Sequence, residues 1–294
     1  MNARRPAFWI DGELRTAGEH GAPLLAHGLH YGTGVFEGIR VYDTDHGPAV
    51  FRLDAHMERL ARGAALLGMD VDVAAMSAAV GPTLHHNHLR AAYVRPLAFY
   101  SSGGLGLDLG PLTATQAVAV LPWTSHLGDE ACETGVALRV SPYRRISASA
   151  LPPLKLTGTY ANACVAKLEA VRAGFEEALF IDDDGFVVEA TGENVFLVKD
   201  GQVVAVEHQD ALPGITRDTV ATLAGATRRK VRLEELLDAD EVFLTGTSAE
   251  VAPVTRLDGR GSMSIGPVTR ELRALYQDVV HGRTPDADRW LTRL

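Results

Sequence analysis

The sequence predicts an α+β protein of two domains, built from antiparallel and mixed sheets with flanking helices. Its 294 residues, 46% of them hydrophobic, are enough to bury two compact cores. Strand pairs joined by tight turns recur along the chain, and the segments with helical periodicity stand apart from them. Strands and helices alternating one by one would instead indicate a doubly wound parallel sheet.

Two hairpins and one helix are predicted near the N-terminus. Asp11-Gly12 lies between two short apolar runs, and this dipeptide favours the positive φ angles of a two-residue hairpin turn. A second hairpin surrounds the turn residues 43–47. Asp54 then fits a helix N-cap, and apolar residues at helical spacing continue to a C-terminal glycine, Gly68. The four strands are expected at residues 8–10, 13–15, 38–42 and 49–53.

The first domain is expected to end with a helical segment and two strands. Residues 73–89 have a helical apolar period, and Gly81-Pro82 predicts either two short helices or one bent helix there. Residues 91–100 and 115–121 are expected to be strands. The periodicity is lost over residues 122–135, which predicts an interdomain loop. The predicted domains are therefore residues 1–121 and 136–294.

The second domain is predicted to combine hairpin-linked strands with separate helices. Lys199-Asp200-Gly201 has the composition of a turn between two strands. Gly214 precedes a helix that begins with Thr216. Strands are expected at 136–140, 177–181, 186–189, 194–198, 202–206, 241–244 and 251–257, and helices at 160–173, 216–224 and 268–280.

Composition excludes several classes of function. The formal net charge of −9 disfavours binding to nucleic acid or to an anionic membrane surface. Two cysteines, Cys132 and Cys164, exclude a disulfide framework or a Cys-rich zinc site, which suggests a reducing cytoplasm. No apolar run reaches the roughly 18 residues of a membrane span, and residues 1–10 lack a signal-peptide core.

Motifs for nucleotides are absent, and those for metals are weak. The chain has no phosphate loop ending in Gly-Lys and no Gly-x-Gly-x-x-Gly that opens a helix. His85, His86 and His88 cluster, but carboxylate or thiolate partners at metal-site spacing are not evident. These histidines are equally explained as a polar helix end, so no metal site is expected.

One lysine stands out from the four in the chain. Lys167, Lys199 and Lys230 are most simply surface charges. Lys155 lies between two leucines and follows Pro152-Pro153, and desolvation in such surroundings disfavours the ammonium form. A neutral amine can attack an aldehyde. An exposed lysine in a proline-bounded loop is the alternative explanation.

Three further segments in the second half of the chain suggest what Lys155 binds. Glu193 lies between two apolar strands, where a buried carboxylate needs a cationic partner such as a protonated pyridine nitrogen. Gly214-Ile215-Thr216 and Gly246-Thr247-Ser248 offer free backbone N–H groups beside hydroxyls, as anion sites do. Each segment alone is an ordinary turn or cap. Together with the lysine they suggest pyridoxal phosphate.

Seven segments resemble the branched-chain amino acid aminotransferases, which are fold-type IV pyridoxal phosphate enzymes with a fold like that of D-amino acid aminotransferase. They occur in the family's order and include Lys155 and Glu193. The segments are Tyr31–Arg40, His56–Leu60, Tyr93–Leu97, Lys155–Tyr160, Glu189–Phe196, Leu212–Asp218 and Gly246–Glu250. The resemblance implies transfer of the amino group of leucine, isoleucine or valine to 2-oxoglutarate.

The resemblance also implies a role for each matched residue. Lys155 would carry the cofactor covalently and then move the proton between substrate Cα and cofactor C4′, and Glu193 would pair with the pyridine nitrogen. Tyr160 would donate to the ring's phenolic oxygen. The phosphate would be held by Arg59, Ile215, Thr216 and Thr247. The substrate's α-carboxylate would be received by Tyr93, Thr247 and Ser248, its apolar side chain by Tyr31 and Phe36, and a distal carboxylate by Arg95. His126 stands in this pocket where well-known relatives have tyrosine.

Alternatives remain open at this stage. D-amino acid aminotransferases, (R)-amine transaminases, transaminases of other hydrophobic amino acids and aminodeoxychorismate lyases share the lysine and the glutamate. Phe36 and the Tyr93-x-Arg95 pattern favour the branched-chain type. A non-catalytic metal binder that uses His85 to His88 is a hypothesis of another class. The family resemblance further implies a homodimer or a higher homo-oligomer.

Overall fold

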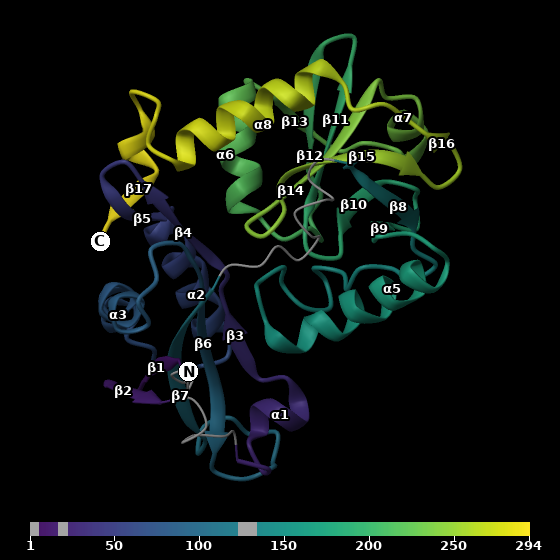
Figure 1. Cartoon of the computed structure of the whole chain (residues 1–294). Helices are drawn as coiled ribbons and strands as arrows, with labels where there is room; N and C mark the ends of the chain where they lie inside the picture. Colours follow the sequence, from purple (N-terminus) through teal and green to yellow (C-terminus); the bar gives the residue numbers. More distant parts are fainter. Residues whose placement is uncertain (1–5, 17–22, 123–133) are drawn as a thin grey trace. The chain divides into compact units, whose positions relative to one another are not determined.

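The computed structural model describes residues 6–16, 23–122 and 134–294, and the chain divides into two compact units (Figure 1). The first unit comprises Met1–Trp123, Leu154–Thr159 and Val280–Leu294. The second comprises Thr124–Pro153 and Tyr160–Val279. Most of the predicted interdomain loop, including His126, lies outside the described residues.

The first unit is an antiparallel sheet with three helices. Its strand order is β17-β5-β4-β6-β7-β1-β2, and β3 pairs with β6 (Figure 1). The strands are β1 (Ala7–Ile10), β2 (Glu13–Thr16), β3 (Gly34–Phe36), β4 (Ile39–Thr44), β5 (Gly47–Phe51), β6 (Ala92–Ser102), β7 (Thr113–Leu121) and β17 (Leu291–Arg293). The helices are α1 (His27–Tyr31), α2 (Leu53–Leu66) and α3 (Val73–His86).

Strand β6 has one buried and one half-buried face. Its even-numbered residues from Ala92 to Tyr100 are buried, and α3 packs against β6, β7 and β1. The odd-numbered residues, Tyr93 and Arg95 among them, are only half-buried on the other face. Of the two alternatives for residues 73–89, the structure has a single helix that runs through Pro82. The predicted cap at Asp54 is displaced, because α2 already begins at Leu53 and Asp54 lies in its first turn.

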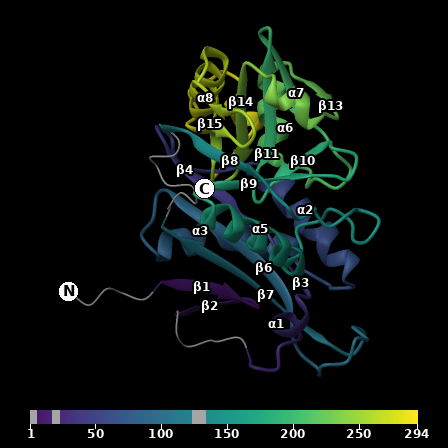
Figure 2. The same ribbon diagram turned by 90° about the vertical axis from the view of Figure 1, so that its right-hand side faces the viewer.

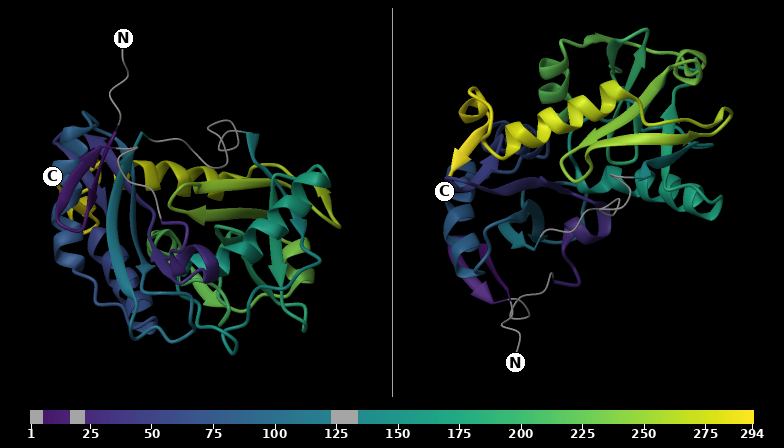
Figure 3. Two further views of the ribbon diagram at one scale, coloured as in Figure 1. Left: turned by 90° about the horizontal axis from the view of Figure 1, so that it is seen from below. Right: turned by 45° about the horizontal axis from the view of Figure 1, so that its top comes forward.

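Two segments that the sequence-based division placed in the second domain belong to the first unit. Residues 154–159 join it because Leu156 bridges Val35 and the Gly158 N–H donates to the Gly32 carbonyl. The C-terminal strand β17 joins it by pairing with β5. Figure 3 shows the segment from α8 to β17 that carries the chain back to this unit. These pairings are long-range contacts, which local composition does not encode.

The second unit is a mixed sheet with helices beside it. Its strand order is β10-β9-β8-β15-β14-β11-β12-β13, with β16 beside β15. The strands are β8 (Val136–Val140), β9 (Glu177–Ile181), β10 (Val187–Ala190), β11 (Asn194–Lys199), β12 (Gln202–Val206), β13 (Thr227–Arg229), β14 (Glu241–Gly246), β15 (Glu250–Leu257) and β16 (Gly261–Ser262). The helices are α5 (Tyr160–Arg172), α6 (Ile215–Ala224), α7 (Leu233–Leu237) and α8 (Pro267–Val280), with 3-10 turns η1 (Thr157–Thr159) and η2 (Ala287–Arg289) elsewhere in the chain.

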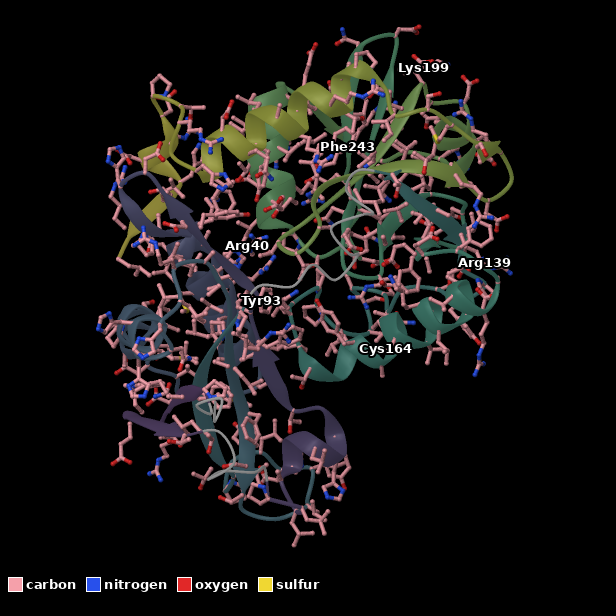
Figure 4. All side chains as sticks on the ribbon, viewed as in Figure 1. Arg40, Tyr93, Arg139, Cys164, Lys199 and Phe243 are labelled. Atoms are coloured by element: carbon pink, nitrogen blue, oxygen red, sulfur yellow. The ribbon has the colours of Figure 1, made fainter. Side chains whose placement is uncertain are left out.

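Small residues let α5 lie close to the sheet. Ala166 and Ala170 are fully buried and pack with Ala178 and Phe180 of β9. Figure 2 shows the ribbon of α5 beside β9. The opposite side of α5 is exposed, and Cys164 points away from the sheet there (Figure 4). A larger cluster of valine, leucine and alanine side chains fills the rest of this unit. The predicted α+β class is therefore confirmed, with sheets that are antiparallel in one unit and mixed in the other.

The elements that the sequence did not predict are short. Among them are α1, β3 and α7, of three to five residues each. Such lengths carry too few apolar periods to be recognised. Within the described ranges, none of the helices combines the length and the apolarity needed to cross a membrane.

Candidate active site

The backbone of Lys155 is hydrogen-bonded to strand β3 of the first unit. Its carbonyl accepts the Phe36 N–H at 3.2 Å, and its Nζ lies 5.0 Å from the centre of the Phe36 ring. Gly32, at φ 66°, permits the close approach of Gly158 after Lys155, because a Cβ on Gly32 would lie 2.4 Å from the Gly158 Cα. Lys155 is half-buried. The lysine is thus held on an ordered backbone beside an aromatic ring.

A cation lies among aromatic rings on the same face of this sheet. The Arg95 guanidinium stacks 4.6 Å from the Phe36 ring centre and donates to the Tyr93 hydroxyl at 2.8 Å. Arg95 Nε is buried and has no hydrogen-bond partner among the described residues. Gly38 leaves the space that Tyr93 fills, since a Cβ there would lie 2.1 Å from its hydroxyl oxygen. Arg40 of β4 stands opposite Tyr93 (Figure 4).

Behind these residues lies a buried ionic cluster. Glu37, fully buried, accepts hydrogen bonds from Arg59 Nε at 2.6 Å, Arg59 Nη2 at 3.0 Å and His56 Nδ1 at 2.7 Å. Burial alone would raise the pKa of Glu37, but Arg59 and His56 hold it far below its ordinary value. The carboxylate is therefore ionised and fixes the guanidinium of Arg59.

Tyr31 has surroundings of its own. Its ring lies 4.5 Å from the His27 ring, and its hydroxyl donates to the Leu105 carbonyl at 3.1 Å. The side chain is about half exposed. Tyr31 thus ties α1 to the loop that contains Leu105.

The second unit holds another buried ion pair, between Arg145 and Glu189, at 2.7 Å. The other oxygen of Glu189 accepts the Leu212 N–H at 2.9 Å and the Asn194 amide at 3.4 Å. Asn194 also donates to the Leu212 carbonyl at 3.0 Å. Arg145 further reaches Asn162 in α5. This pair therefore joins the loop before α5, the end of β10, the start of β11 and the loop before α6.

Glu193 lies next to the turn after β14. It is buried, and its Oε2 accepts the N–H of Gly192 at 3.2 Å. A Cβ on Gly246 would lie 3.2 Å from Glu193 Cγ, so the glycine allows this approach. Thr247 and Ser248 follow and are half-buried. Thr245 Oγ1 is buried without a partner in the described part of the chain.

Helix α6 begins at the predicted anion-binding segment. Its N-cap is Gly214, and no side chain caps this end. A Cβ on Gly214 would lie 1.8 Å from Asn194 Oδ1. Thr216 is 2% exposed in the first turn. Uncapped N–H groups and the helix dipole together favour an anion at this end.

The structure distributes the predicted residues between the two units. Tyr31, Phe36, Arg59, Tyr93, Arg95 and Lys155 belong to the first, and Tyr160, Glu193, Ile215, Thr216, Thr247 and Ser248 to the second. Tyr160 is half-buried at the start of α5. His126 lies outside the described residues.

Sequence reasoning missed Glu37, Arg145 and Glu189 as members of the buried clusters. Glu37 and Glu189 lie inside matched segments. The available signal was a carboxylate next to apolar strand residues, where burial would require a charged partner. The described residues contain no group of three or more potential metal ligands, and His85, His86 and His88 are exposed around the end of α3.

Comparison with known proteins gives the family. Residues 34–257 match the amino-transferase class IV family. The chain is 38% identical to the branched-chain-amino-acid aminotransferase of Pseudomonas aeruginosa over 302 residues, which cover 99% of this chain and 98% of the relative.

Solved structures agree with this result. The branched-chain amino acid aminotransferase from the organism abbreviated T.th., crystallised with pyridoxamine 5′-phosphate, matches with a TM-score of 0.94 at 40% identity, over 99% of each chain. The PLP form of the enzyme from Thermobaculum terrenum matches with a TM-score of 0.89 at 31% identity, over 98% of each chain. The chain therefore belongs to the class IV amino-transferase family.

Proposed function

We propose that this protein is a pyridoxal phosphate-dependent aminotransferase that transfers the amino group of leucine, isoleucine or valine to 2-oxoglutarate. The observation that carries the proposal is the near full-length similarity to branched-chain aminotransferases, one of them crystallised in its PLP form. The match to the family covers every proposed site residue except Tyr31, which lies just before it.

The residues present fit this cofactor. A Cβ on Gly38 would collide with Tyr93, one on Gly246 would crowd Glu193, and one on Gly214 would collide with Asn194 at the start of α6. Buried polar atoms without a described partner remain on His56, Arg95 and Thr245. The N-terminus of α6 supplies uncapped N–H groups for a phosphate. Each unit by itself thus offers groups that suit part of an anionic, aromatic ligand.

We assign the cofactor contacts as follows. Lys155 attaches the cofactor and later moves a proton between substrate Cα and cofactor C4′. Tyr160 donates to the phenolic oxygen. Arg59, Ile215, Thr216 and Thr247 hold the phosphate. When bound, pyridoxal phosphate supplies the electron sink for the charge left on Cα when its proton departs.

The partner of the ring nitrogen is one of two buried carboxylates. Glu193 is the predicted residue. Glu189 is the second candidate, because Arg145 holds its carboxylate in place and its other hydrogen bonds join the loop before α6. Replacing each by glutamine and measuring activity with pyridoxal phosphate and with its 1-deaza analogue separates them. In the variant of the true partner, activity should be the same with the 1-deaza analogue as with pyridoxal phosphate. In the other variant, activity should fall further with the analogue.

Two neighbouring side chains of the first unit support the acceptance of two unlike substrates. Phe36 offers an apolar surface for a branched side chain, whereas Arg95, stacked on that ring, offers a charge for the distal carboxylate of glutamate. Tyr93, with Thr247 and Ser248, receives the α-carboxylate. We include Tyr31 and His126 as further pocket residues.

The visible absorption spectrum tests this function. Bleaching of the bound cofactor's band by L-leucine, L-valine and L-glutamate, but not by D-alanine, is the expected result. Bleaching only by D-alanine or an (R)-amine would indicate another transaminase of the family. Lys155→Ala should abolish turnover, and Lys167→Ala, which changes a lysine paired with Glu177, is the matched control.

We also propose a cytoplasmic homodimer. Four leucines of the first unit are exposed beside the Tyr31 contact: Leu24, Leu25, Leu29 and Leu107. His27 joins their segments through the Gly106 carbonyl at 2.9 Å. A patch of this kind favours a protein interface. Light scattering should show a dimer, and Leu107→Asp should weaken it more than Leu66→Asp, a change of an exposed leucine on α2.

A further inference from the structure

His56 is a buried side chain to which the proposed mechanism gives no role. It lies on α2, one turn before Arg59, and is 1% exposed. Its Nδ1 lies 2.7 Å from the ionised carboxylate of Glu37, so Nδ1 carries a proton and donates it. Its Nε2 is buried and has no hydrogen-bond partner among the described residues. A ligand that forms a hydrogen bond to Nε2 would satisfy this buried nitrogen.

The charges around His56 explain why this nitrogen is unprotonated. Burial lowers the pKa of His56, and the cations Arg59 and Lys155 lower it further, while Glu37 acts in the opposite direction. Glu37 stands between β3 and β4, Arg59 on α2 itself, and Lys155 on the segment 154–159. Burial is the largest of these causes, Glu37 opposes it, and the smaller effects of Arg59 and Lys155 add to it. A second proton on His56 would be unfavourable there.

A bound dianion would reverse that balance. A phosphate monoester carries a charge between −1.5 and −2 at about neutral pH. Placed against Arg59, it would more than cancel the charge of Lys155. A proton on Nε2 would then restore neutrality and give the anion a charged N–H donor.

We propose that His56 is an anion-binding residue of the phosphate site, which becomes doubly protonated when a tetrahedral dianion binds beside Arg59. The inference rests on the proposed function for the position of that anion. Glu37 is the positioning residue, because it fixes both Arg59 and the Nδ1–H tautomer of His56. Binding is thereby linked to the uptake of one proton, which moves from solvent to Nε2.

Sulfate is the suitable probe, because it is a tetrahedral dianion that does not titrate near neutral pH. Calorimetry of the cofactor-free protein in buffers of different ionisation enthalpy counts the protons taken up. We expect close to one proton per sulfate above pH 7, and an association constant that falls up to tenfold per pH unit. His56→Gln should show neither effect. His85→Gln, a change of an exposed histidine on α3, should keep both.

Further outcomes separate this inference from the proposed function. Sulfate binding without proton uptake, no sulfate binding, or equal uptake in His56→Gln would each overturn it. If Arg59→Gln binds sulfate as well as the unaltered protein, the phosphate site itself is misplaced. Should His56→Gln fail to fold, ¹⁵N resonances of the labelled histidine in the unaltered protein give the same answer. Its Nε2 must change from unprotonated to protonated as sulfate is added.

Discussion

Removal of Arg145 should destabilise the second unit far more than removal of another arginine that has a glutamate partner. Arg145 and Glu189 have side chains that are 10% and 7% exposed, whereas Arg139 and Glu169, in the same unit, are 30% and 27% exposed. The distances within the two pairs are similar, at 2.7 and 2.9 Å. Burial is therefore the main difference between them.

The expected magnitudes follow from that difference. Arg145→Met leaves the Glu189 carboxylate buried without its cation, which costs about 3–5 kcal/mol in comparable cases. The Leu212 N–H and the Asn194 amide still reach this carboxylate, so the lower end, about 3 kcal/mol, is expected here. Arg139→Met breaks a partly exposed pair whose attraction solvent screens, so it should cost far less.

Urea unfolding of the cofactor-free protein measures both changes. Circular dichroism gives the free energy of unfolding, and hydrogen exchange of β9 and β11 amides shows that the loss lies in the second unit. The double variant Arg145→Met/Glu189→Gln removes both charges and should recover part of the stability.

Two results would refute this reasoning. Equal losses in Arg145→Met and Arg139→Met would show that burial does not determine the cost. A double variant as unstable as the sum of its single changes would show that lost packing, rather than an unpaired charge, is responsible.

Three further predictions concern other parts of the molecule. The pKa of His56 lies below its ordinary value of 6.5, because burial lowers it, Glu37 raises it less, and Arg59 and Lys155 lower it further. As the pH falls, the unfolded chain therefore binds this proton before the folded chain does. The contribution of His56 to thermal stability should be complete above pH 6.5 and decrease below it. A plot of the thermal unfolding midpoint against pH should be flatter for His56→Gln, and an unchanged slope would contradict this. Gly214→Ala should weaken cofactor binding in a fluorescence titration, because its Cβ would lie 1.8 Å from Asn194 Oδ1, whereas Gly106→Ala, with nothing within 4 Å, should not. Glu241→Ala should release the first turn of α8, since Glu241 accepts the N–H groups of Val268 and Thr269 and the Thr269 hydroxyl. The cost of about 2 kcal/mol should appear as faster hydrogen exchange there, and unchanged protection would count against the assignment.

Local sequence patterns predicted most of the regular elements. The strands 136–140, 177–181 and 202–206 have the predicted bounds, because apolar alternation between turn residues is a local property. The hairpin at Asp11-Gly12 forms with both residues at positive φ. Short elements such as β3 were not predicted, since three residues contain no period and the strand exists only by pairing with β6.

The candidate site residues stay predictions, and residue type decides which of them the sequence can suggest. Lys155 and the glycine segments could be proposed because reactive residue types and turn glycines are visible in sequence. The buried partners of Arg59 and Glu189 were not, because Glu37 lies 22 residues from Arg59 and Arg145 lies 44 residues from Glu189. Charge pairing over such separations depends on which strands become neighbours.

The sequence by itself determined the α+β class, the lysine and the segments shared with the family, because periodicity, turn chemistry and residue type are local properties. Only the tertiary structure decided that residues 154–159 leave the second unit to lie beside β3, and that Glu37, His56 and Arg59 share one buried cluster. The physical reason is that burial and strand pairing are properties of the folded chain. A glutamate in an exposed turn is a solvated charge, whereas a glutamate inside the core can be the fixed partner of a guanidinium.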